Sequence, residues 1–285
     1  GADPRPRTSV LVEDGIIQRV ASMENMGRPS EGRVIDLSGM TLMPGLTDAH
    51  VHFGAVGVNG LTDSSADDNL TTYVISVIEN IELALQEGFT TVRDAGGLDA
   101  AFARATGQGL IKGPRILPSG SHLSQTGGHG DRRSRYDEEP IRSVPGILAA
   151  PVLVDGPEAV RAAARQQLRL GASQVKLMAS GGIMSPIDAL ESVQFTVGEM
   201  QAAVCEADMA GKYVLAHCHT SPLLSSQRSP VHIRTRSYAF GLSLPNTHRS
   251  RSRRTMTSPN VIDDSSRTRP RLKFTPRVTS APGLV

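Results

Sequence analysis

The chain has 285 residues, which suits one large domain or one domain with a smaller companion. No apolar run reaches the roughly 18 residues that a membrane-spanning helix needs, and the first residues lack the layout of a signal peptide, so no membrane association is expected. With only two cysteines, Cys205 and Cys218, no disulfide framework is expected, and a reducing, cytoplasmic compartment fits the composition best.

The formal net charge of +2 hides two regions of opposite charge. Residues 221–285 contain 11 Arg, 1 Lys and 2 Asp, which gives 12 − 2 = +10, so residues 1–220 carry +2 − 10 = −8. This change in composition predicts a boundary near residue 220.

Two strand pairs are predicted at the start of the chain. Asp14-Gly15 lies between the apolar runs of residues 9–20, and Ser38-Gly39 is bracketed in the same way within residues 33–46. An Asp-Gly pair between apolar runs is a strong hairpin signal.

From Leu46 onward, short apolar strands alternate with helical patterns. A helix follows residue 70, a second runs from Asp155 to Gly171, and Thr196 with Glu199 forms the capping-box pattern of a third. Such alternation is typical of a parallel sheet covered by helices. Five strands are predicted, at about residues 46–53, 89–95, 114–119, 173–180 and 213–219.

Groups that can bind a metal lie at or near the ends of three of these strands. His50 and His52, in GLTDAHVHFG, share a strand face, although two polar residues at a strand end would give the same pattern. Lys176 lies in a strand predicted to be buried, where the amine loses its proton more easily, unless the side chain snorkels to solvent. His217 ends the fifth strand. In a parallel β/α scaffold these strand ends converge on one face.

Four motifs resemble the metal-dependent amidohydrolase superfamily, in the branch of imidazolonepropionase-like enzymes, Xaa-Pro dipeptidases and ochratoxin amidases. They are TLMPGLTDAHVHF, LSQTGGHGD, VKLMASGGIMSP and VLAHCHT. The resemblance implies an α/β fold with a TIM-type β/α barrel and a small N-terminal β-sandwich. Residues 1–44 would form part of the sandwich, and residues 45–220 would form an incomplete barrel.

The resemblance also implies a site with two divalent metal ions, most often zinc. His50 and His52 would hold the first ion and His217 the second, while Lys176, carboxylated by carbon dioxide, would bridge both. A metal-bound hydroxide would then cleave a C–N bond of a small amide, dipeptide or lactam. His129 and His219 are candidate catalytic residues that contact substrate, and ordinary loop or outer-shell histidines fit their positions equally well. Relatives often assemble, which leaves a homo-oligomer open.

The chain departs from the family after residue 220. The sixth-strand histidine and the eighth-strand aspartate of the family are not readable, and His232, Asp263 and Asp264 stay unassigned. The Ser/Arg/Pro-rich stretch 221–285 has three interpretations: a basic arm, a disordered extension, or an out-of-frame translation. The third is favoured, because composition changes abruptly straight after a family motif, and codons for residues 233–237 read one nucleotide later permit Ser-Glu-His-Gly, which supports it.

Five strands cannot close a barrel, so we expect the chain as written to fold poorly or to be inactive. The alternative hypothesis is a non-catalytic barrel fragment whose arginine-rich tail binds nucleic acid. Nucleic-acid binding is the less favoured of the two, and it predicts salt-dependent binding that is lost when residues 221–285 are deleted.

Overall fold

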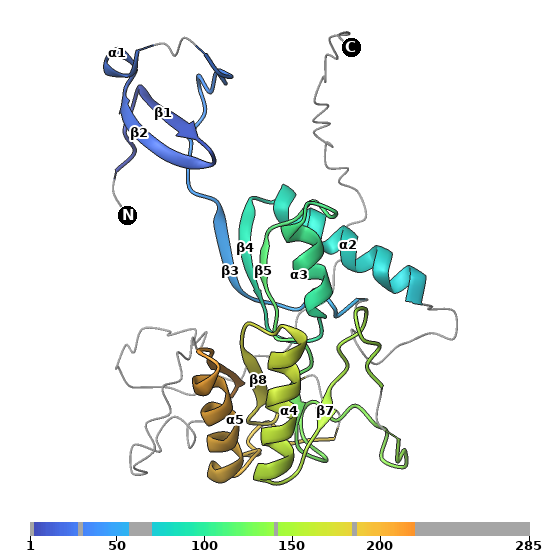
Figure 1. Cartoon of the computed structure of the whole chain (residues 1–285). Coiled ribbons are helices and arrows are strands. Elements are labelled where there is room, and N and C mark those ends of the chain that lie inside the picture. The colour runs from blue at the N-terminus through green and yellow to red at the C-terminus, as the bar shows by residue number, and fades with distance from the viewer. Residues whose placement is uncertain (1–2, 28–30, 57–69, 140–141, 184–186, 220–285) are drawn as a thin grey trace, which may run out of the picture. The chain divides into compact units, whose positions relative to one another are not determined.

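The computed structural model describes residues 3–27, 31–56, 70–139, 142–183 and 187–219 (Figure 1). The predicted tail at 221–285, with His232, Asp263 and Asp264, lies outside the described residues. Across the ranges that are described, no helix combines the length and the apolar character that crossing a membrane requires.

The first predicted hairpin is confirmed. Strands β1 (Thr8–Glu13) and β2 (Ile16–Ser22) pair antiparallel, and the short helix α1 (Met23–Met26) follows. Asp14 and Gly15 join the strands with φ values of 50° and 74°. Positive φ at both central residues defines the tight turn that matches the twist of a hairpin, which explains why Asp-Gly stands there.

The second predicted strand pair is wrong. Ser38 and Gly39 do form a turn, in which the amide of Ser38 donates to Oδ1 of Asp36 at 2.9 Å and Met40 donates to the carbonyl of Leu37 at 2.9 Å. The flanking residues, however, are not strands. The side chain of Asp36 supplies a hydrogen-bond acceptor within the turn itself, and no described strand lies beside the flanking residues to pair with them. The sandwich of residues 1–44 therefore stays a prediction.

Three parallel strands form the first sheet, in the order β3-β4-β5. They are β3 (Leu46–Val51), β4 (Phe89–Asp94) and β5 (Arg115–Leu117). Helices α2 (Leu70–Gln86) and α3 (Ala100–Gly107) pack against this sheet (Figure 1). Their shared core consists of Phe53, Val77, Ile81, Val92, Leu98, Phe102 and Ile116.

Four more parallel strands form the second sheet, in the order β7-β6-β8-β9. They are β6 (Leu123–Ser124), β7 (Val152–Leu153), β8 (Val175–Met178) and β9 (Val214–His217). Helices α4 (Pro157–Leu170) and α5 (Val197–Met209) pack on each other and on this sheet. The five predicted strands and their three helices are thus confirmed, including the capping box of Thr196 and Glu199. Strands β6 and β7 are additional.

Hydrogen bonds connect the two sheets between the end of β5 and the start of β8. The amide of Ser173 donates to the carbonyl of Pro118 at 2.7 Å. The buried side chain of Gln174 donates to the carbonyls of Asp94 and Leu117, both at 3.0 Å. Buried polar groups that are fully paired in this way fix the register of the strands they join.

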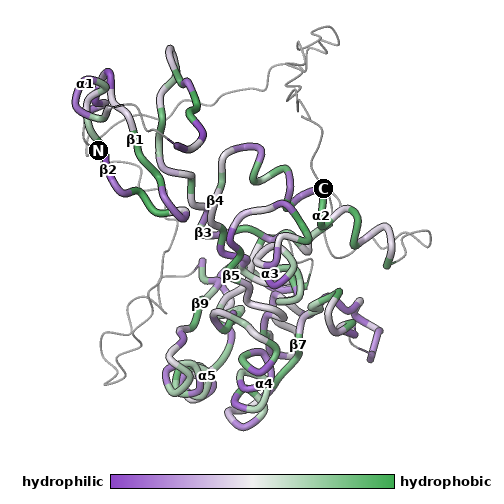
Figure 2. The backbone as a smooth tube through the Cα atoms, turned by 45° about the horizontal axis from the view of Figure 1, so that its top comes forward, coloured by the Kyte–Doolittle hydropathy of each residue, from purple (hydrophilic) through white to green (hydrophobic). Residues whose placement is uncertain are grey.

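Helices α4 and α5 are joined by a buried carboxylate as well as by apolar contacts. Along α4, hydrophilic and hydrophobic segments alternate from turn to turn, as expected of an amphipathic helix (Figure 2). Glu206 on α5 accepts hydrogen bonds from Arg165 at 2.7 and 2.9 Å and from Arg161 at 2.9 Å. These bonds hold the pKa of Glu206 below its ordinary value.

We expect Glu206→Gln to lower the Tm at neutral pH, because the paired arginines lose their carboxylate. A lowered pKa in the folded state stabilises the fold above the unfolded value of about 4.3, and this contribution is lost as pH falls through the folded pKa. The difference in Tm between the two proteins should therefore shrink below about pH 4. Calorimetry from pH 3 to pH 8 measures it.

The control is Glu158→Gln, because the side chain of Glu158 is 86% exposed and contacts Arg161 at 3.4 Å. This variant should change the Tm little at any pH. An equal loss of Tm at pH 3 and pH 7 in Glu206→Gln would contradict the electrostatic account.

Candidate metal centre

His50 and His52 converge at the carboxyl end of β3. Their Nε2 atoms lie 3.2 Å apart. Two ligands of a tetrahedral zinc ion, each about 2.0–2.1 Å from the metal, lie about 3.3 Å apart. The pair therefore has the spacing of two ligands on one ion. Each of the two residues keeps part of its surface exposed to solvent.

The second nitrogen of His52 fixes the tautomer of its ring. Nδ1 lies 2.9 Å from the carbonyl oxygen of Gly96, which can only accept, so Nδ1 carries the proton. Burial lowers the pKa of His52, and burial together with the charge of Lys176 lowers the pKa of His50 to about 4. Both rings are thus neutral at neutral pH, and Nε2 of His52 presents a lone pair. A histidine that binds metal commonly donates its other N–H to a carbonyl in this way.

Lys176 lies in the interior, as predicted. Its side chain is 0% exposed, and all four residues of β8 are buried. Its Nζ has no hydrogen-bond partner within the described part of the chain, so the side chain does not snorkel. Burial, with a smaller contribution from Arg93, lowers the pKa of Lys176 to about 8. An appreciable fraction of the amine is then unprotonated and nucleophilic at neutral pH.

His217 meets the loop histidine His129 at the end of β9. Their rings stack with centroids 4.5 Å apart, and the ring of His219 lies edge-on to His217 at 4.6 Å. Nε2 of His217 is buried and has no partner among the residues that are described. Burial first, then the charges of His129 and Lys176, lower the pKa of His217 to about 3. His129 is buried, whereas His219 is exposed.

The charge of Lys176 links the two groups of histidines. It lowers the pKa of His50, His52 and His217, and β8, which carries Lys176, pairs with β9, which ends at His217. As the side chains stand, no group of three His, Cys, Asp or Glu residues in the described ranges is placed to hold one ion. The donor types nevertheless fit metal binding, because neutral imidazoles are metal ligands and two buried atoms, Lys176 Nζ and His217 Nε2, have no partner among the residues that the structure describes.

Two residues near this site were missed by the sequence analysis. His122, directly before β6, is 2% exposed, and both of its ring nitrogens lack partners within the described residues. Arg132 follows LSQTGGHGD, and its charge lowers the pKa of His52, His122 and His129. The one sequence feature that pointed to this region was the pair of glycines on either side of His129. Glycines of this kind mark places where the backbone packs closely against other groups.

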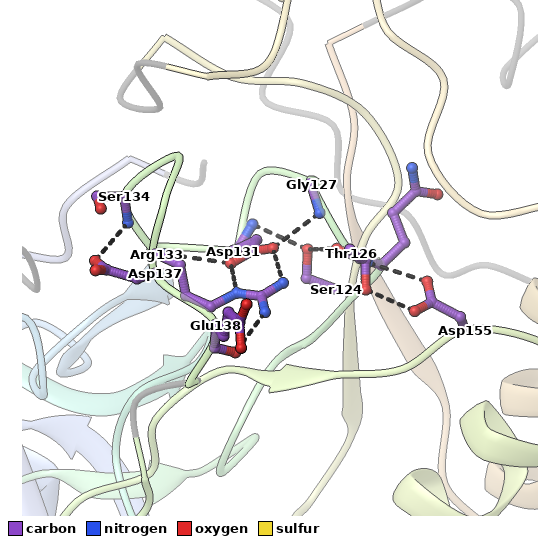
Figure 3. Close-up of polar contacts among 11 residues, drawn as sticks. Ser124, Thr126, Gly127, Asp131, Arg133, Ser134, Asp137, Glu138 and Asp155 are labelled. Atoms are coloured by element: carbon purple, nitrogen blue, oxygen red, sulfur yellow. Dashed lines mark hydrogen bonds and ion pairs between the residues drawn. The ribbon is translucent and has the colours of Figure 1, made fainter.

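A dense network of hydrogen bonds holds the loop that carries His129 and Arg132 (Figure 3). Asp131 accepts two bonds from the guanidinium of Arg133, at 2.8 and 2.7 Å, and a third from the amide of Gly127 at 2.8 Å. The amide and hydroxyl of Thr126 donate to the two oxygens of Asp155 at 3.0 and 2.6 Å. These contacts give the loop one defined conformation.

Asp94 stabilises the backbone beside the site. Its carboxylate accepts hydrogen bonds from the amides of Phe53 at 2.8 Å and Gly96 at 3.0 Å. It therefore ties the segments that follow β3 and β4, next to the Gly96 carbonyl that contacts His52. Burial raises the pKa of Asp94 to about 7.

The parallel strands, with helices packed on them, define an α/β protein whose candidate site lies at the carboxyl ends of the strands. The profile of the amidohydrolase family matches residues 41–250. Ochratoxinase of Aspergillus niger is 40% identical over 237 residues, which cover 76% of this chain and 47% of that protein. A crystal structure of an amidohydrolase matches with a TM-score of 0.69 and 40% identity, over 76% of this chain and 52% of the other.

A crystal structure of a prolidase complexed with N-methylphosphonate-L-proline also matches, with a TM-score of 0.66 and 39% identity, over 75% of this chain and 52% of the other. The chain belongs to the amidohydrolase family, which confirms the predicted resemblance. It spans about half the length of the curated relatives it matches. The profile match continues beyond residue 220, so the predicted boundary there stays a prediction.

We expect Gly182→Ala to displace the ring of His129. An added Cβ would approach three atoms of that ring more closely than van der Waals contact allows. Overpacking of this kind costs about 1–3 kcal/mol. The ring signals of His129 and His217 should shift in NMR spectra, because the stacked pair is separated.

Gly107→Ala is the matched control, since an added Cβ at Gly107 meets nothing within 4 Å. Unchanged histidine signals in Gly182→Ala would show that the ring does not pack on this glycine.

Proposed function

We propose that residues 45–219 form part of the catalytic β/α barrel of a metal-dependent hydrolase that cleaves C–N bonds. The order of the parallel strands supports a barrel, because β3, β4 and β5 neighbour one another in chain order and β8 is followed by β9. The observation that carries the proposal is the 3.2 Å approach of the His50 and His52 Nε2 atoms near the buried amine of Lys176.

In this proposal the site holds two divalent ions, with zinc the expected metal. His50 and His52 would hold one ion and His217 the other, and Lys176 would supply a carbamate oxygen as a further ligand after its unprotonated amine adds to carbon dioxide and releases one proton. The carbamate carries a negative charge where the ammonium carried a positive one. Bound divalent ions polarise a substrate carbonyl and lower the pKa of an attacking water.

The surrounding residues position these groups. Gly96 holds the ring of His52 through Nδ1, so its Nε2 stays available. His129 lies against His217, and its backbone amide is fixed by the side-chain oxygen of Gln194 at 2.8 Å. Nδ1 of His129 lies 3.6 Å from Asp188. The charge of that carboxylate favours a proton on the ring, and Nε2 is the nitrogen proposed to contact substrate. His219 is more exposed and stays the weaker candidate for such a contact.

The substrate class proposed is a small amide or dipeptide. Ochratoxinase and a prolidase are among the proteins this chain resembles at about 40% identity. The prolidase was crystallised with N-methylphosphonate-L-proline, in which a tetrahedral phosphonate precedes a proline. A tetrahedral phosphonate resembles the intermediate of amide hydrolysis, and the proline supplies a free carboxyl group. Such a compound therefore suits a site that hydrolyses an acylated amino acid.

Metal analysis of the full chain tests this proposal. After dialysis with zinc and bicarbonate, we expect about two Zn2+ ions per chain, because the proposed set has ligands for a pair. Lys176→Met should lose most of the metal, and any hydrolysis of N-benzoylglycine should fall about 100-fold or more. Lys112→Met removes an exposed lysine and serves as control.

Metal content and turnover are separable outcomes. A chain that binds zinc through Lys176 without turning over substrate has the proposed centre but lacks the ligands expected beyond residue 220. Full zinc binding and turnover in Lys176→Met would contradict the proposal.

A further inference from the structure

We propose that Asp94 is a positioning residue for His52, and that its carboxylate fixes both the backbone after His52 and the carbonyl that the ring contacts. These two hydrogen bonds keep the proton of the His52 ring on Nδ1, so that the lone pair of Nε2 stays available to a cation. The effect on the ring is a property of the metal-free chain. Its consequence for metal binding rests on the proposed function.

The two oxygens of the Asp94 carboxylate serve different segments of the chain. Asp94 ends β4 and is fully buried. Its Oδ2 accepts a hydrogen bond from the amide of Phe53, the residue directly after His52, at 2.8 Å. Its Oδ1 accepts from the amide of Gly96 at 3.0 Å, and the carbonyl oxygen of Gly96 lies 2.9 Å from Nδ1 of His52. One side chain therefore holds the backbone and the ring contact of the same histidine.

Gly96 needs such support because its own conformation is weakly determined. Its φ of 129° lies in a region that glycine adopts readily and other residues rarely adopt. Hydrogen bonds hold the peptides on both sides of its Cα. The amide of Gly96 donates to Asp94. The amide of Gly97, which shares a peptide plane with the Gly96 carbonyl, donates to the carbonyl of Gly120 at 2.9 Å. The Gly96 carbonyl therefore keeps one direction, toward His52.

A carboxylate suits this position better than an amide because it only accepts hydrogen bonds. An asparagine in its place would present one oxygen and one NH2 group, so the amide of either Phe53 or Gly96 would face a second donor. The backbone of Asp94 is held independently. Its carbonyl accepts from the hydroxyl of Ser119 at 2.8 Å and from the side chain of Gln174 at 3.0 Å. Asp94→Asn therefore changes the side-chain contacts and leaves the end of the strand in place.

Asp99 provides a matched control, because it makes the same kind of contact with other segments. It is 8% exposed, and its two oxygens accept from the amides of Ala101 at 2.8 Å and Gly146 at 3.0 Å. Asp99→Asn thus also removes one acceptor from a pair of backbone amides. The contacts of Phe53 and Gly96 do not involve Asp99. A purely structural role of both carboxylates predicts the same behaviour in the two variants.

The tautomer of His52 is measured by 15N NMR of the full chain, labelled at histidine and free of metal. Burial raises the pKa of Asp94 to about 7, so spectra recorded at about pH 8.5 report on the ionised carboxylate. A spectrum of His52→Gln assigns the signals. Thermal melts show whether each variant is folded, and Asp94→Ser, which keeps a single acceptor, is used if Asp94→Asn does not fold.

In the wild-type chain, His52 should carry its proton on Nδ1 alone. Asp94→Asn should give a mixture of the two tautomers, because the Gly96 carbonyl is no longer held toward the ring, whereas Asp99→Asn should match the wild type. A wild-type ring protonated on Nε2 would overturn the inference. So would an unchanged tautomer in whichever of Asp94→Asn and Asp94→Ser is folded, or an equal change in Asp99→Asn.

Zinc affinity, measured by competition with a chelating dye, extends the test to the metal. Asp94→Asn should bind zinc about 10- to 100-fold more weakly, the usual effect of losing a residue that orients a metal ligand. Asp99→Asn should bind zinc as tightly as the wild type. Equal zinc affinity of Asp94→Asn and the wild type would contradict the consequence for metal binding.

The inference and the proposed function can fail separately. A tautomer that depends on Asp94, in a chain that binds no zinc, supports the positioning of His52 and counts against the metal-dependent hydrolase. Zinc binding and cleavage of N-benzoylglycine, with a tautomer that does not respond to substitution of Asp94, leave the hydrolase proposal standing and overturn the role of Asp94.

Discussion

A buried amine that finds no hydrogen-bond partner within the described chain is the constraint on which the rest of this structure depends. Lys176 lies on a fully buried strand, and an ammonium ion there lacks the water that would stabilise its charge. Burial therefore lowers the pKa of the amine to about 8, which increases the fraction of the uncharged form that can react with carbon dioxide. Burial also lowers the pKa of His50 and His217, to about 4 and about 3, so both rings are neutral at neutral pH.

Positive charge accumulates around this amine. Arg93 lowers the pKa of Lys176, and Arg132 lowers the pKa of His52 and two other rings. A carbamate at Lys176 would bring negative charge to a region that has a surplus of cations. The proposed carbamate thus reduces the positive charge of this region. Divalent ions would bind only once the charge on the Lys176 side chain has changed from positive to negative.

Much of the fold could be predicted because its signals are local. The alternation of short apolar strands and amphipathic helices placed five strands and three helices, and Asp14-Gly15 placed the first turn. The strand pair predicted around Ser38-Gly39 is wrong, because a turn signal does not show whether the residues on either side of the turn pair as strands. Strands β6 and β7 were missed because a strand of two residues is too short to show the alternation of apolar and polar side chains.

The site was only partly accessible from sequence. His50, His52, Lys176 and His217 stood out through motif spacing, and the structure places the first two at the end of β3, Lys176 within β8 and His217 at the end of β9. His122 and Arg132 had no comparable signal, since the sequence does not show which buried nitrogens are left without a partner among the described residues.

Anomalous X-ray diffraction at the zinc edge, from crystals of the full chain grown with zinc and bicarbonate, tests the central claim most directly. The account predicts a pair of peaks, one bound by His50 and His52 and the other by His217, with added density on Lys176 Nζ between them. Zinc bound elsewhere, or a bare Lys176 amine beside a single ion, would contradict it.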